Sequence, residues 1–387
     1  MKRHLQTAIL KDLNRKIVLL SGPRQTGKTT LAKSLGLSFD YLNWDFLEDR
    51  VSVLKKKWDR SKELVIFDEL HKMEKFKSWL KGVYDKEGIP PAILVTGSAR
   101  LDIAKKMGDS LAGRFFPFRL YPLDLWEISK TGAPFNPIQT YERLLSCSGF
   151  PEPFLNGEES YYRRWAKTHL DMILRQDLLD LESVRNIGSI ETLVALLQTR
   201  VGSTVSFASL SRDLQVDPKT VRRWLDLLEN LFVIFRVPPF HKNIARSLLK
   251  EPKYYFFDQA RVKGDEGQKA ENLVALALKK QLDTLQDVEG CTGKIYFIRT
   301  RDKREVDFLI DWEDSKVSPL MIEVKLSDGN LSSSLSYMKG SFEHSNRIQL
   351  VKNLDREKHF PSGEKVLSLI DWLAKMPLRS MYGGTIQ

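Results

Sequence analysis

The sequence has no apolar stretch long enough to cross a membrane, and its longest apolar runs, such as residues 17–20, have the length of one strand. The N-terminus also lacks the long apolar core of a signal peptide. Cysteine is nearly absent, and Cys147 and Cys291 lie too far apart in sequence to form a metal-ligand pair. We therefore expect a cytoplasmic protein with no membrane partner and with two buried free thiols.

The sequence has fewer acidic than basic residues, with 50 Asp and Glu against 61 Lys and Arg, for a formal net charge of +11. Such an excess attracts phosphate polyanions, and a solvated basic surface is the alternative. The 387 residues exceed what one core usually serves, so we expect two to three domains. Hydrophobic residues at 42% and charged residues at 29% are typical of a folded protein.

Apolar runs alternate with helical stretches over residues 1–130, which predicts an α/β fold with a parallel sheet. The strands expected there cover residues 16–20, 39–43, 64–67, 92–96 and 115–120. Three further regions follow: a helical linker at 131–199, a small helical unit of DNA-binding type at 200–250, and a second α/β domain at 251–387. Strands are expected in the last region at residues 254–258, 294–300, 305–311, 320–326 and 347–352.

A glycine-rich segment lies between the first expected strand and a helix. Its sequence, Gly-Pro-Arg-Gln-Thr-Gly-Lys-Thr-Thr at residues 22–30, is a complete GxxxxGKT loop in the strand–loop–helix context that phosphate binding requires. The loop N–H groups surround the phosphates, Lys28 reaches the β and γ phosphates, and the Thr29 hydroxyl binds Mg²⁺. The predicted ATP-binding residues are Gly22, Pro23, Arg24, Gln25, Thr26, Gly27, Lys28, Thr29 and Thr30.

Two carboxylates, Asp68 and Glu69, directly follow the expected strand at 64–67. Ligands bind at the carboxyl ends of strands in open α/β sheets. We expect Asp68 to hold Mg²⁺ and Glu69 to polarise the attacking water. A strand that ends in two acids by chance is the weaker alternative, because the phosphate loop requires such a partner. No Asn-Lys-x-Asp run selects guanine, so the predicted cofactors are ATP and Mg²⁺ and the predicted activity is ATP hydrolysis.

Two later polar residues are candidates for the same reaction. Ser98 follows the strand at 92–96 and would sense the γ-phosphate, with Thr96 as second choice and a plain turn as an equal alternative. Arg114 lies between a helix and a strand and would act as a finger on the nucleotide of a neighbouring copy, which requires a homo-oligomer. A surface arginine is the equal alternative.

These motifs together resemble one family, the bacterial and archaeal AAA+-like ATPases that carry a C-terminal domain of unknown function. The resemblance rests on the loop at 22–30, Tyr-Leu-Asn-Trp-Asp at 41–45, Asp-Glu-Leu-His-Lys at 68–72, Thr-Gly-Ser-Ala at 96–99, Ala-Gly-Arg at 112–114, Pro-Leu-Asp at 122–124, Gly-Phe-Pro-Glu at 149–152 and Lys-Tyr-Tyr-Phe-Phe-Asp at 253–258. It covers most of the chain. It implies an ATPase module, a helical lid, a winged helix and a nuclease-like fold, and it brings no cellular role.

The winged helix is also indicated by the residues themselves. Residues 206–216 predict a short helix, and Asp217 and Pro218 are typical of the start of the next helix. That helix has an apolar stripe formed by Val221, Trp224, Leu225, Leu228 and Leu231. The residues that face outward, and would contact DNA, are Lys219, Thr220, Arg222 and Arg223. A winged helix used only for packing or protein contacts is an equal alternative.

A possible nuclease-like site follows from strand alternation near the C-terminus. Alternation places Glu323 and Lys325 on one face of a strand and Asp307 on one face of another, while Glu271 begins a helix upstream. Carboxylates bind Mg²⁺, and a lysine beside them orients a water for attack on a phosphodiester. This pattern resembles the restriction-endonuclease-like superfamily, whose metal and catalytic positions would be Glu271, Asp307, Glu323 and Lys325. A retained fold without cleavage activity is the alternative.

Two classes of function stay open. In the first, an ATPase acts on nucleic acid, or is regulated by it, through the winged-helix and nuclease-like regions. In the second, the chain is a nucleotide-dependent switch, a scaffold or a protein-remodelling ATPase without nuclease activity. The sequence identifies neither the substrate nor the pathway.

Overall fold

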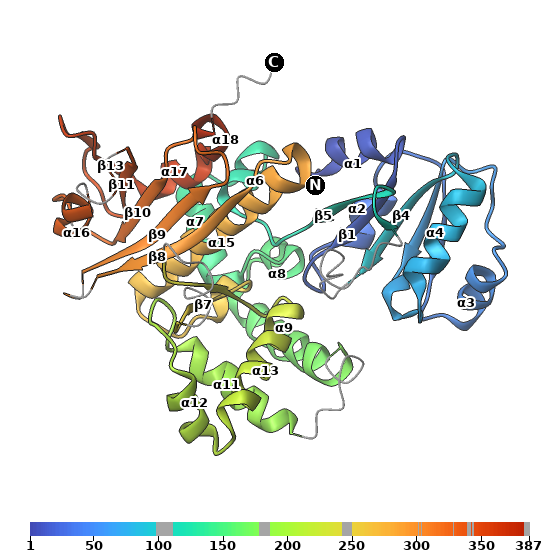
Figure 1. Ribbon diagram of the computed structural model, residues 1–387, viewed down its shortest axis with the longest axis horizontal. Helices are drawn as coiled ribbons and strands as arrows, with labels where there is room; N and C mark the ends of the chain where they lie inside the picture. The colour runs from blue at the N-terminus through green and yellow to red at the C-terminus, as the bar shows by residue number, and fades with distance from the viewer. Residues whose placement is uncertain are drawn as a thin grey trace. The chain divides into compact units, whose positions relative to one another are not determined.

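The chain folds into two compact units, each with its own sheet. The computed structural model describes residues 1–97, 111–177, 186–241, 250–300, 302, 304–327, 329–338, 342 and 344–382. The first unit contains Met1–Pro122 and Asn230–Phe232, and the second contains Leu123–Glu229 and Val233–Gln387. The ranges expected to form the lid, the winged helix and the C-terminal α/β domain fall almost entirely in the second unit (Figure 1).

The first unit has a five-stranded sheet in which all neighbours are parallel. Its order is β2-β3-β4-β1-β5, so β4 lies between β1 and β3. The strands are β1 (Ile17–Ser21), β2 (Phe39–Asn43), β3 (Leu64–Asp68), β4 (Ala92–Gly97) and β5 (Phe115–Arg119). The expectation of five strands in a parallel α/β sheet is confirmed.

Helices cover both faces of this sheet, so β1, β3 and β4 are buried along their whole length and are apolar up to their carboxyl ends. On one face α1 (Gln6–Leu13) and α2 (Lys28–Lys33) share a core with Val18, Leu20 and Ile66. On the other face α3 (Leu47–Leu54) and α4 (Phe76–Glu87) share a core with Leu19, Val65 and Phe67. The core therefore fixes both sides of the strands and leaves their ends for polar residues.

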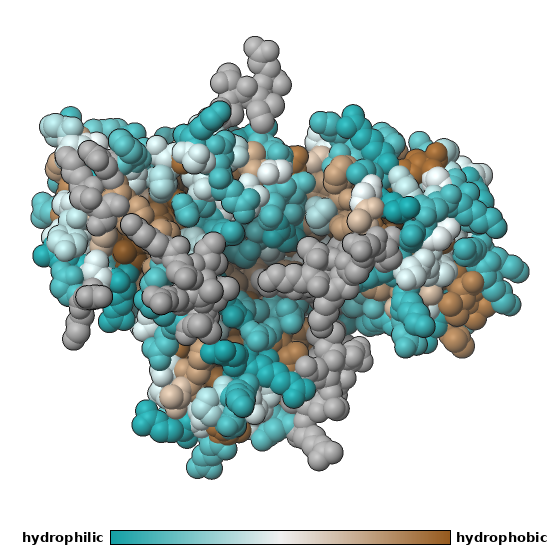
Figure 2. Space-filling model, viewed as in Figure 1, coloured by the Kyte–Doolittle hydropathy of each residue, from teal (hydrophilic) through white to brown (hydrophobic). Residues whose placement is uncertain are grey.

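A few large apolar side chains remain exposed around α3, where the space-filling view shows a brown area (Figure 2). They are Phe46, Leu47, Val51 and Leu54. The rest of the face in this view is mostly hydrophilic. Among the described residues, no helix is both long and apolar enough to cross a membrane.

The second unit has a mixed six-stranded sheet of order β12-β13-β11-β10-β9-β8. Its strands are β8 (Gly293–Arg299), β9 (Glu305–Trp312), β10 (Leu320–Lys325), β11 (Asn346–Val351), β12 (Lys358–His359) and β13 (Lys365–Ser368). The long helix α15 (Glu266–Glu289) packs on β8 and β10. Three shorter helices complete this region: α16 (Ser333–Tyr337), α17 (Leu369–Lys375) and α18 (Leu378–Met381). The expected second α/β region is thus present, with a sheet that mixes parallel and antiparallel pairs.

The middle of the second unit is helical. It comprises α6 (Leu125–Lys130), α7 (Pro137–Cys147), α8 (Pro151–Asn156), α9 (Glu159–Met172) with a π-helical turn (Ile173–Asp177), and α11 (Ile187–Gln198). Buried ion pairs join its first helix to α15, because Lys280 Nζ lies 2.6 Å from Glu127 Oε2 and 3.2 Å from Asp124 Oδ1. Cys147 and Cys291 are both free and buried, as expected.

The segment expected to be a winged helix, residues 200–250, contains two helices and one strand, and this strand pairs with a strand that follows residue 250. The helices are α12 (Phe207–Leu214) and α13 (Pro218–Asn230), and β6 (Ile234–Val237) pairs antiparallel with β7 (Lys253–Phe256). All five residues of the predicted apolar stripe are buried. On the opposite side of α13, Lys219, Arg222 and Arg223 are exposed and Thr220 is half-buried. The helix boundaries and the direction of its faces therefore agree with the sequence pattern.

Candidate functional site

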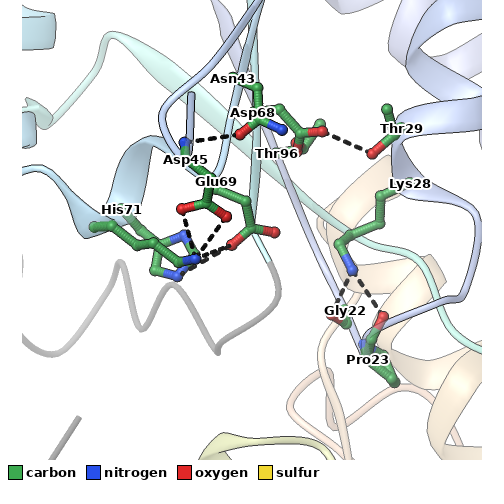
Figure 3. Close-up of polar contacts among 11 residues, drawn as sticks. Gly22, Pro23, Lys28, Thr29, Asn43, Asp45, Asp68, Glu69, His71 and Thr96 are labelled. Carbon is green, nitrogen blue, oxygen red and sulfur yellow. Dashed lines mark hydrogen bonds and ion pairs between the residues drawn. The ribbon is translucent and has the colours of Figure 1, made fainter. Parts of the chain in front are cut away.

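The phosphate loop connects β1 to α2 and needs glycine at its first position. Gly22 has φ +148°, and a Cβ at this residue would lie 2.1 Å from the Leu120 carbonyl oxygen. The side chain of Lys28 is buried and turns back into the loop, where Nζ donates to the carbonyls of Gly22 at 3.0 Å and Pro23 at 2.7 Å (Figure 3). The lysine cation is therefore already positioned inside the loop that would surround the phosphates.

Asp68 is the centre of a hydroxyl network at the carboxyl edge of the sheet. Its Oδ2 accepts from Thr29 Oγ1 at 2.8 Å and from the Tyr41 hydroxyl at 2.7 Å. Its Oδ1 accepts from Thr96 Oγ1, which reaches it because β4 lies next to β3 (Figure 3). Asp68 is buried, so these donors stabilise a charge that water does not solvate. Burial and the contact with Asp68 raise the pKa of Tyr41 well above its usual value.

The oxygen atoms of this network fit a hard divalent cation. The Thr29 hydroxyl and the Asp68 carboxylate are hydrogen-bonded to each other, and hydroxyl and carboxylate oxygens are the ligands that Mg²⁺ prefers. Thr29 is the second residue of α2, directly after the phosphate loop, and Asp68 is the last residue of β3. The residues that would hold the cation are therefore Thr29 and Asp68.

Glu69 follows β3 in a left-handed conformation with φ +55°. Burial raises the pKa of its carboxyl, and the charges of Lys28 and Lys72 partly oppose this. His71 Nε2 lies 3.6 Å from Glu69 Oε2, but burial and the neighbouring lysines lower the pKa of His71 to about 4, so this contact is not an ion pair at neutral pH. A carboxylate with a raised pKa next to the phosphate loop is suited to accept a proton from water.

Two side chains of this site carried no predicted role. Arg3 is buried and donates Nη1 to the Thr26 carbonyl at 2.7 Å and Nη2 to the Tyr121 carbonyl at 2.6 Å. Arg3 thereby connects the phosphate loop to the segment after β5. It precedes the first strand and belongs to no sequence motif, so the sequence did not indicate this role. Tyr41 lies in the Tyr-Leu-Asn-Trp-Asp segment, and its position in β2, the strand beside β3, was the signal that could have identified it.

The remaining predicted residues of the first unit have different positions. Arg24 is close enough to Glu69 and His71 for its charge to lower the pKa of both. Ser98 lies outside the described residues. Arg114 precedes β5 at the end of the sheet opposite to the loop, where its carbonyl accepts from Ile17 N, and its guanidinium binds Asp85 at 2.6 and 3.1 Å. Arg114 is therefore remote from the phosphate loop of its own chain.

The four residues predicted to form a nuclease-like site lie together in the second unit. Glu271 is on α15, Asp307 on β9, and Glu323 and Lys325 on β10. Asp307 Oδ2 accepts from Val324 N at 2.8 Å, and Lys325 Nζ lies 2.9 Å from Glu323 Oε1. Burial, with the charges of Glu271 and Glu323, raises the pKa of Asp307 well above its usual value. Burial also raises the pKa of Glu323.

A lysine that the sequence did not assign to this cluster lies in its interior. Lys253 Nζ on β7 is 2.6 Å from Glu305 Oε1, 3.2 Å from Glu271 Oε1 and 3.8 Å from Asp307 Oδ1. In the part of the chain that the structure describes, no group of three His, Cys, Asp or Glu residues is arranged to hold a metal ion. The carboxylates of the predicted nuclease-like site therefore lie in one place, with Lys253 among them.

Three protein-family models match successive parts of the chain. Residues 14–129 match an AAA domain, residues 138–262 a domain of unknown function (DUF8612), and residues 266–371 another domain of unknown function (DUF4143). The AAA domain contains the phosphate loop, Asp68 and Glu69. This match and the parallel sheet support an ATPase.

The curated relatives are uncharacterized proteins. One from Mycobacterium tuberculosis is 26% identical over 309 residues, which cover 76% of this chain and 67% of that protein. One from Methanocaldococcus jannaschii is 23% identical over 349 residues, covering 81% and 76%. One from Haemophilus influenzae is 21% identical over 388 residues, covering 92% and 94%. Similarity thus extends over most of the chain.

Among solved structures, a Signal Transduction ATPase with Numerous Domains (STAND) protein with a tetratricopeptide repeat sensor, from Pyrococcus horikoshii, is 13% identical with a TM-score of 0.23. The match covers 74% of this chain and 47% of that chain.

Replacing Arg3 with alanine tests its role in holding the phosphate loop. We expect the free energy of unfolding to fall by about 3 kcal/mol, because two buried carbonyls lose charged donors. ATP should also bind more weakly, since the loop loses its tie at Thr26. Urea denaturation and nucleotide titration measure the two effects, and Lys2→Ala is the control because Lys2 is exposed. If neither the free energy of unfolding nor the affinity for ATP changes, Arg3 does not hold the phosphate loop in place.

Proposed function

We propose that this chain binds and hydrolyses ATP, with the reaction at the phosphate loop of the first unit. The observation that carries the proposal is the contact of Thr29 with Asp68 at the mouth of the loop, beside the buried Lys28. Mg²⁺, when bound, would neutralise charge on the β and γ phosphates. Thr29 and Asp68 would hold that cation, and the ammonium of Lys28 would bind phosphate oxygens in place of its loop carbonyls.

Glu69 is the residue that we propose for orienting the attacking water. Its carboxyl lies near Lys28, whose charge acts on it, and burial raises its pKa above the usual value of a glutamate, which makes the carboxylate a stronger base. Thr96 Oγ1 donates a hydrogen bond to Asp68 Oδ1, so Thr96 positions that carboxylate. Thr96 therefore has a role other than the second-choice γ-phosphate sensor.

Two substitutions test the ATPase directly. Lys28→Ala should abolish phosphate release, because the loop then loses the buried ammonium that is directed into it. Glu69→Gln should keep ATP binding and lower turnover by about 100-fold or more, because an amide cannot accept the proton of water. Glu74→Gln is the matched control, since Glu74 is an exposed glutamate close to Glu69 in the sequence. Wild-type turnover in Glu69→Gln would exclude Glu69 as the base.

We also propose that the active form is a homo-oligomer in which Arg114 acts on the nucleotide of a neighbouring copy. This is supported by the position of Arg114 at the end of the sheet away from its own loop. Its ion pair with Asp85 keeps the guanidinium at a partly exposed surface.

Mixing inactive variants tests this arrangement. Arg114→Ala and Lys28→Ala subunits should each be inactive alone and should regain part of the ATPase activity when mixed, because some sites then combine an intact Lys28 with a neighbour's intact Arg114. Arg60→Ala is the control, since Arg60 forms a similar surface pair with Glu87. A monomer with full activity would contradict the proposal.

For the second unit we propose binding to the phosphate backbone of nucleic acid, so that nucleic acid is acted on or regulates the ATPase. The support is chemical. Lys219, Arg222 and Arg223 are exposed on one side of α13. A hollow of about 810 Å³ in the same unit is lined by three glutamates and by six basic residues, namely Arg163, Lys167, Arg261, Lys263, Lys269 and Lys352. Both surfaces have an excess of positive charge.

Charge reversal distinguishes these two surfaces. Lys219→Glu with Arg222→Glu and Arg223→Glu should weaken DNA binding about 10-fold or more and reduce the salt dependence of binding by about 2 to 3 in slope, because each lost phosphate contact contributes about 0.9. The matched variant replaces Lys167, Lys263 and Lys269 in the hollow by glutamate. Fluorescence anisotropy with duplex and single-stranded oligonucleotides measures both. If neither variant changes binding, or no binding occurs, the nucleic-acid proposal is wrong.

A second candidate function is a nucleotide-dependent switch, a scaffold or a protein-remodelling ATPase without nuclease activity. The position of Lys253 among the carboxylates of the nuclease-like cluster favours it. The expected fold does not by itself imply catalysis. The restriction-endonuclease-like arrangement expected for Glu271, Asp307, Glu323 and Lys325 supplies cleavage only with a metal ion.

A further inference from the structure

The acidic cluster of the second unit surrounds the ammonium group of Lys253. Lys253 is 1% exposed, and its Nζ contacts carboxylates from two elements: Glu271 on α15, and Glu305 and Asp307 on β9. The ring of Phe297 lies 5.4 Å from the same atom. An ammonium removed from water to this extent requires counter-charges, and the cluster supplies three.

The position of this ammonium is fixed by the backbone of β7. Phe256 N donates to Asn272 Oδ1 at 2.7 Å, and Asn272 Nδ2 donates to the Phe256 carbonyl at 3.0 Å, so a fully buried amide joins β7 to α15. Tyr255 adds a hydrogen bond from its hydroxyl to Glu271 Oε1 at 2.7 Å. Lys253 itself pairs with Val237 of β6. The lysine is therefore held in place by a strand and a helix.

The carboxylates keep Lys253 charged despite its burial. Burial alone lowers the pKa of a lysine, but Glu271, Asp307 and Glu305 together raise the pKa of Lys253 above its usual value. The carboxylates therefore favour the charged form of this buried lysine. It neutralises charge at the point where the carboxylates converge.

The surroundings of the cluster also restrict access. A Cβ on Gly202 would lie 2.5 Å from Glu271 Oε2, so the backbone passes directly against this carboxylate. Arg299 Nε lies 3.7 Å from Glu305 Oε2 on another side. Lys325 is paired with Glu323 at the exposed end of β10.

We propose that Lys253 is the resident cation of this carboxylate cluster and that the cluster does not bind a divalent metal ion. A metal ion needs several oxygens at about 2.0 to 2.6 Å from one point, and an ammonium occupies the space between these carboxylates. The cluster then stabilises the junction of β7, α15 and β9, and it activates no water for phosphodiester attack. This inference does not depend on ATP hydrolysis or on nucleic-acid binding.

Metal titration of the full chain tests the proposal. All variants carry Thr29→Ala and are studied without nucleotide, so that the phosphate loop contributes no metal site. With Lys253 intact, millimolar Mn²⁺ should bind no more tightly than to the same protein with Asp307→Asn and Glu323→Gln, as measured by electron paramagnetic resonance of free Mn²⁺. Mn²⁺ binding that needs Asp307 and Glu323 while Lys253 is intact would overturn the proposal.

Removing the lysine should open the cluster. Lys253→Met should gain about one Mn²⁺ per chain, because the converging carboxylates then have no internal cation. Adding Asp307→Asn should remove this site. Lys325→Met is the matched control, since it removes a lysine that contacts only the edge of the cluster, and it should gain none. A folded Lys253→Met protein that gains no Mn²⁺ would contradict the idea that lysine takes the place of a metal.

A stability measurement keeps the test independent of whether Lys253→Met folds. In the presence of EDTA, Glu271→Gln and Glu305→Gln should each lower Tm by about 4 °C or more, because the buried ammonium loses a counter-charge. Glu313→Gln is the control, since Glu313 forms an exposed pair with Lys294, and its Tm should not change. A higher Tm in Glu271→Gln would mean that repulsion between carboxylates dominates, and it would overturn the proposal.

Discussion

The buried carboxylate of Asp68 is the interaction on which the candidate ATPase site depends. Three hydroxyls from Thr29, Tyr41 and Thr96 hold it at the carboxyl edge of the sheet, and they come from a helix and two neighbouring strands. Parallel pairing brings these elements to the same edge, since Asp68 is in register with Thr96 on one side and Asn43 on the other. A change in strand register would therefore separate the Thr96 and Tyr41 hydroxyls from the carboxylate of Asp68.

The two carboxylate centres of this chain satisfy their charge in different ways. Asp68 accepts hydrogen bonds from neutral hydroxyls, which stabilise the anion and leave its negative charge available to a divalent cation. Glu305 lies 2.6 Å from the ammonium of Lys253, so the protein itself provides the cation. A neutral donor and an internal cation both stabilise a buried carboxylate, but the internal cation also offsets part of the negative charge that would attract a metal.

The two units also differ in the functional residues that they contain. The first unit has the loop, the lysine and the paired carboxylates of an ATPase, and its match to an AAA domain supports this activity. The second unit has basic surfaces on α13 and around a hollow, together with an acidic cluster that contains an internal ammonium. These features distinguish it from the first unit, which holds the phosphate loop.

The sequence by itself determined the features that depend on local pattern. The phosphate loop, the five strands of the first sheet and the faces of α13 follow from residues close to one another in the chain, because loop geometry and side-chain periodicity are local properties. Tertiary structure decided the rest. Arg3 meets Thr26, Thr96 meets Asp68, and Lys253 meets Glu305 only after distant segments pack together. Sequence periodicity does not predict these contacts. Burial strengthens each of them, because a charge or hydroxyl that is removed from water interacts more strongly with its partner.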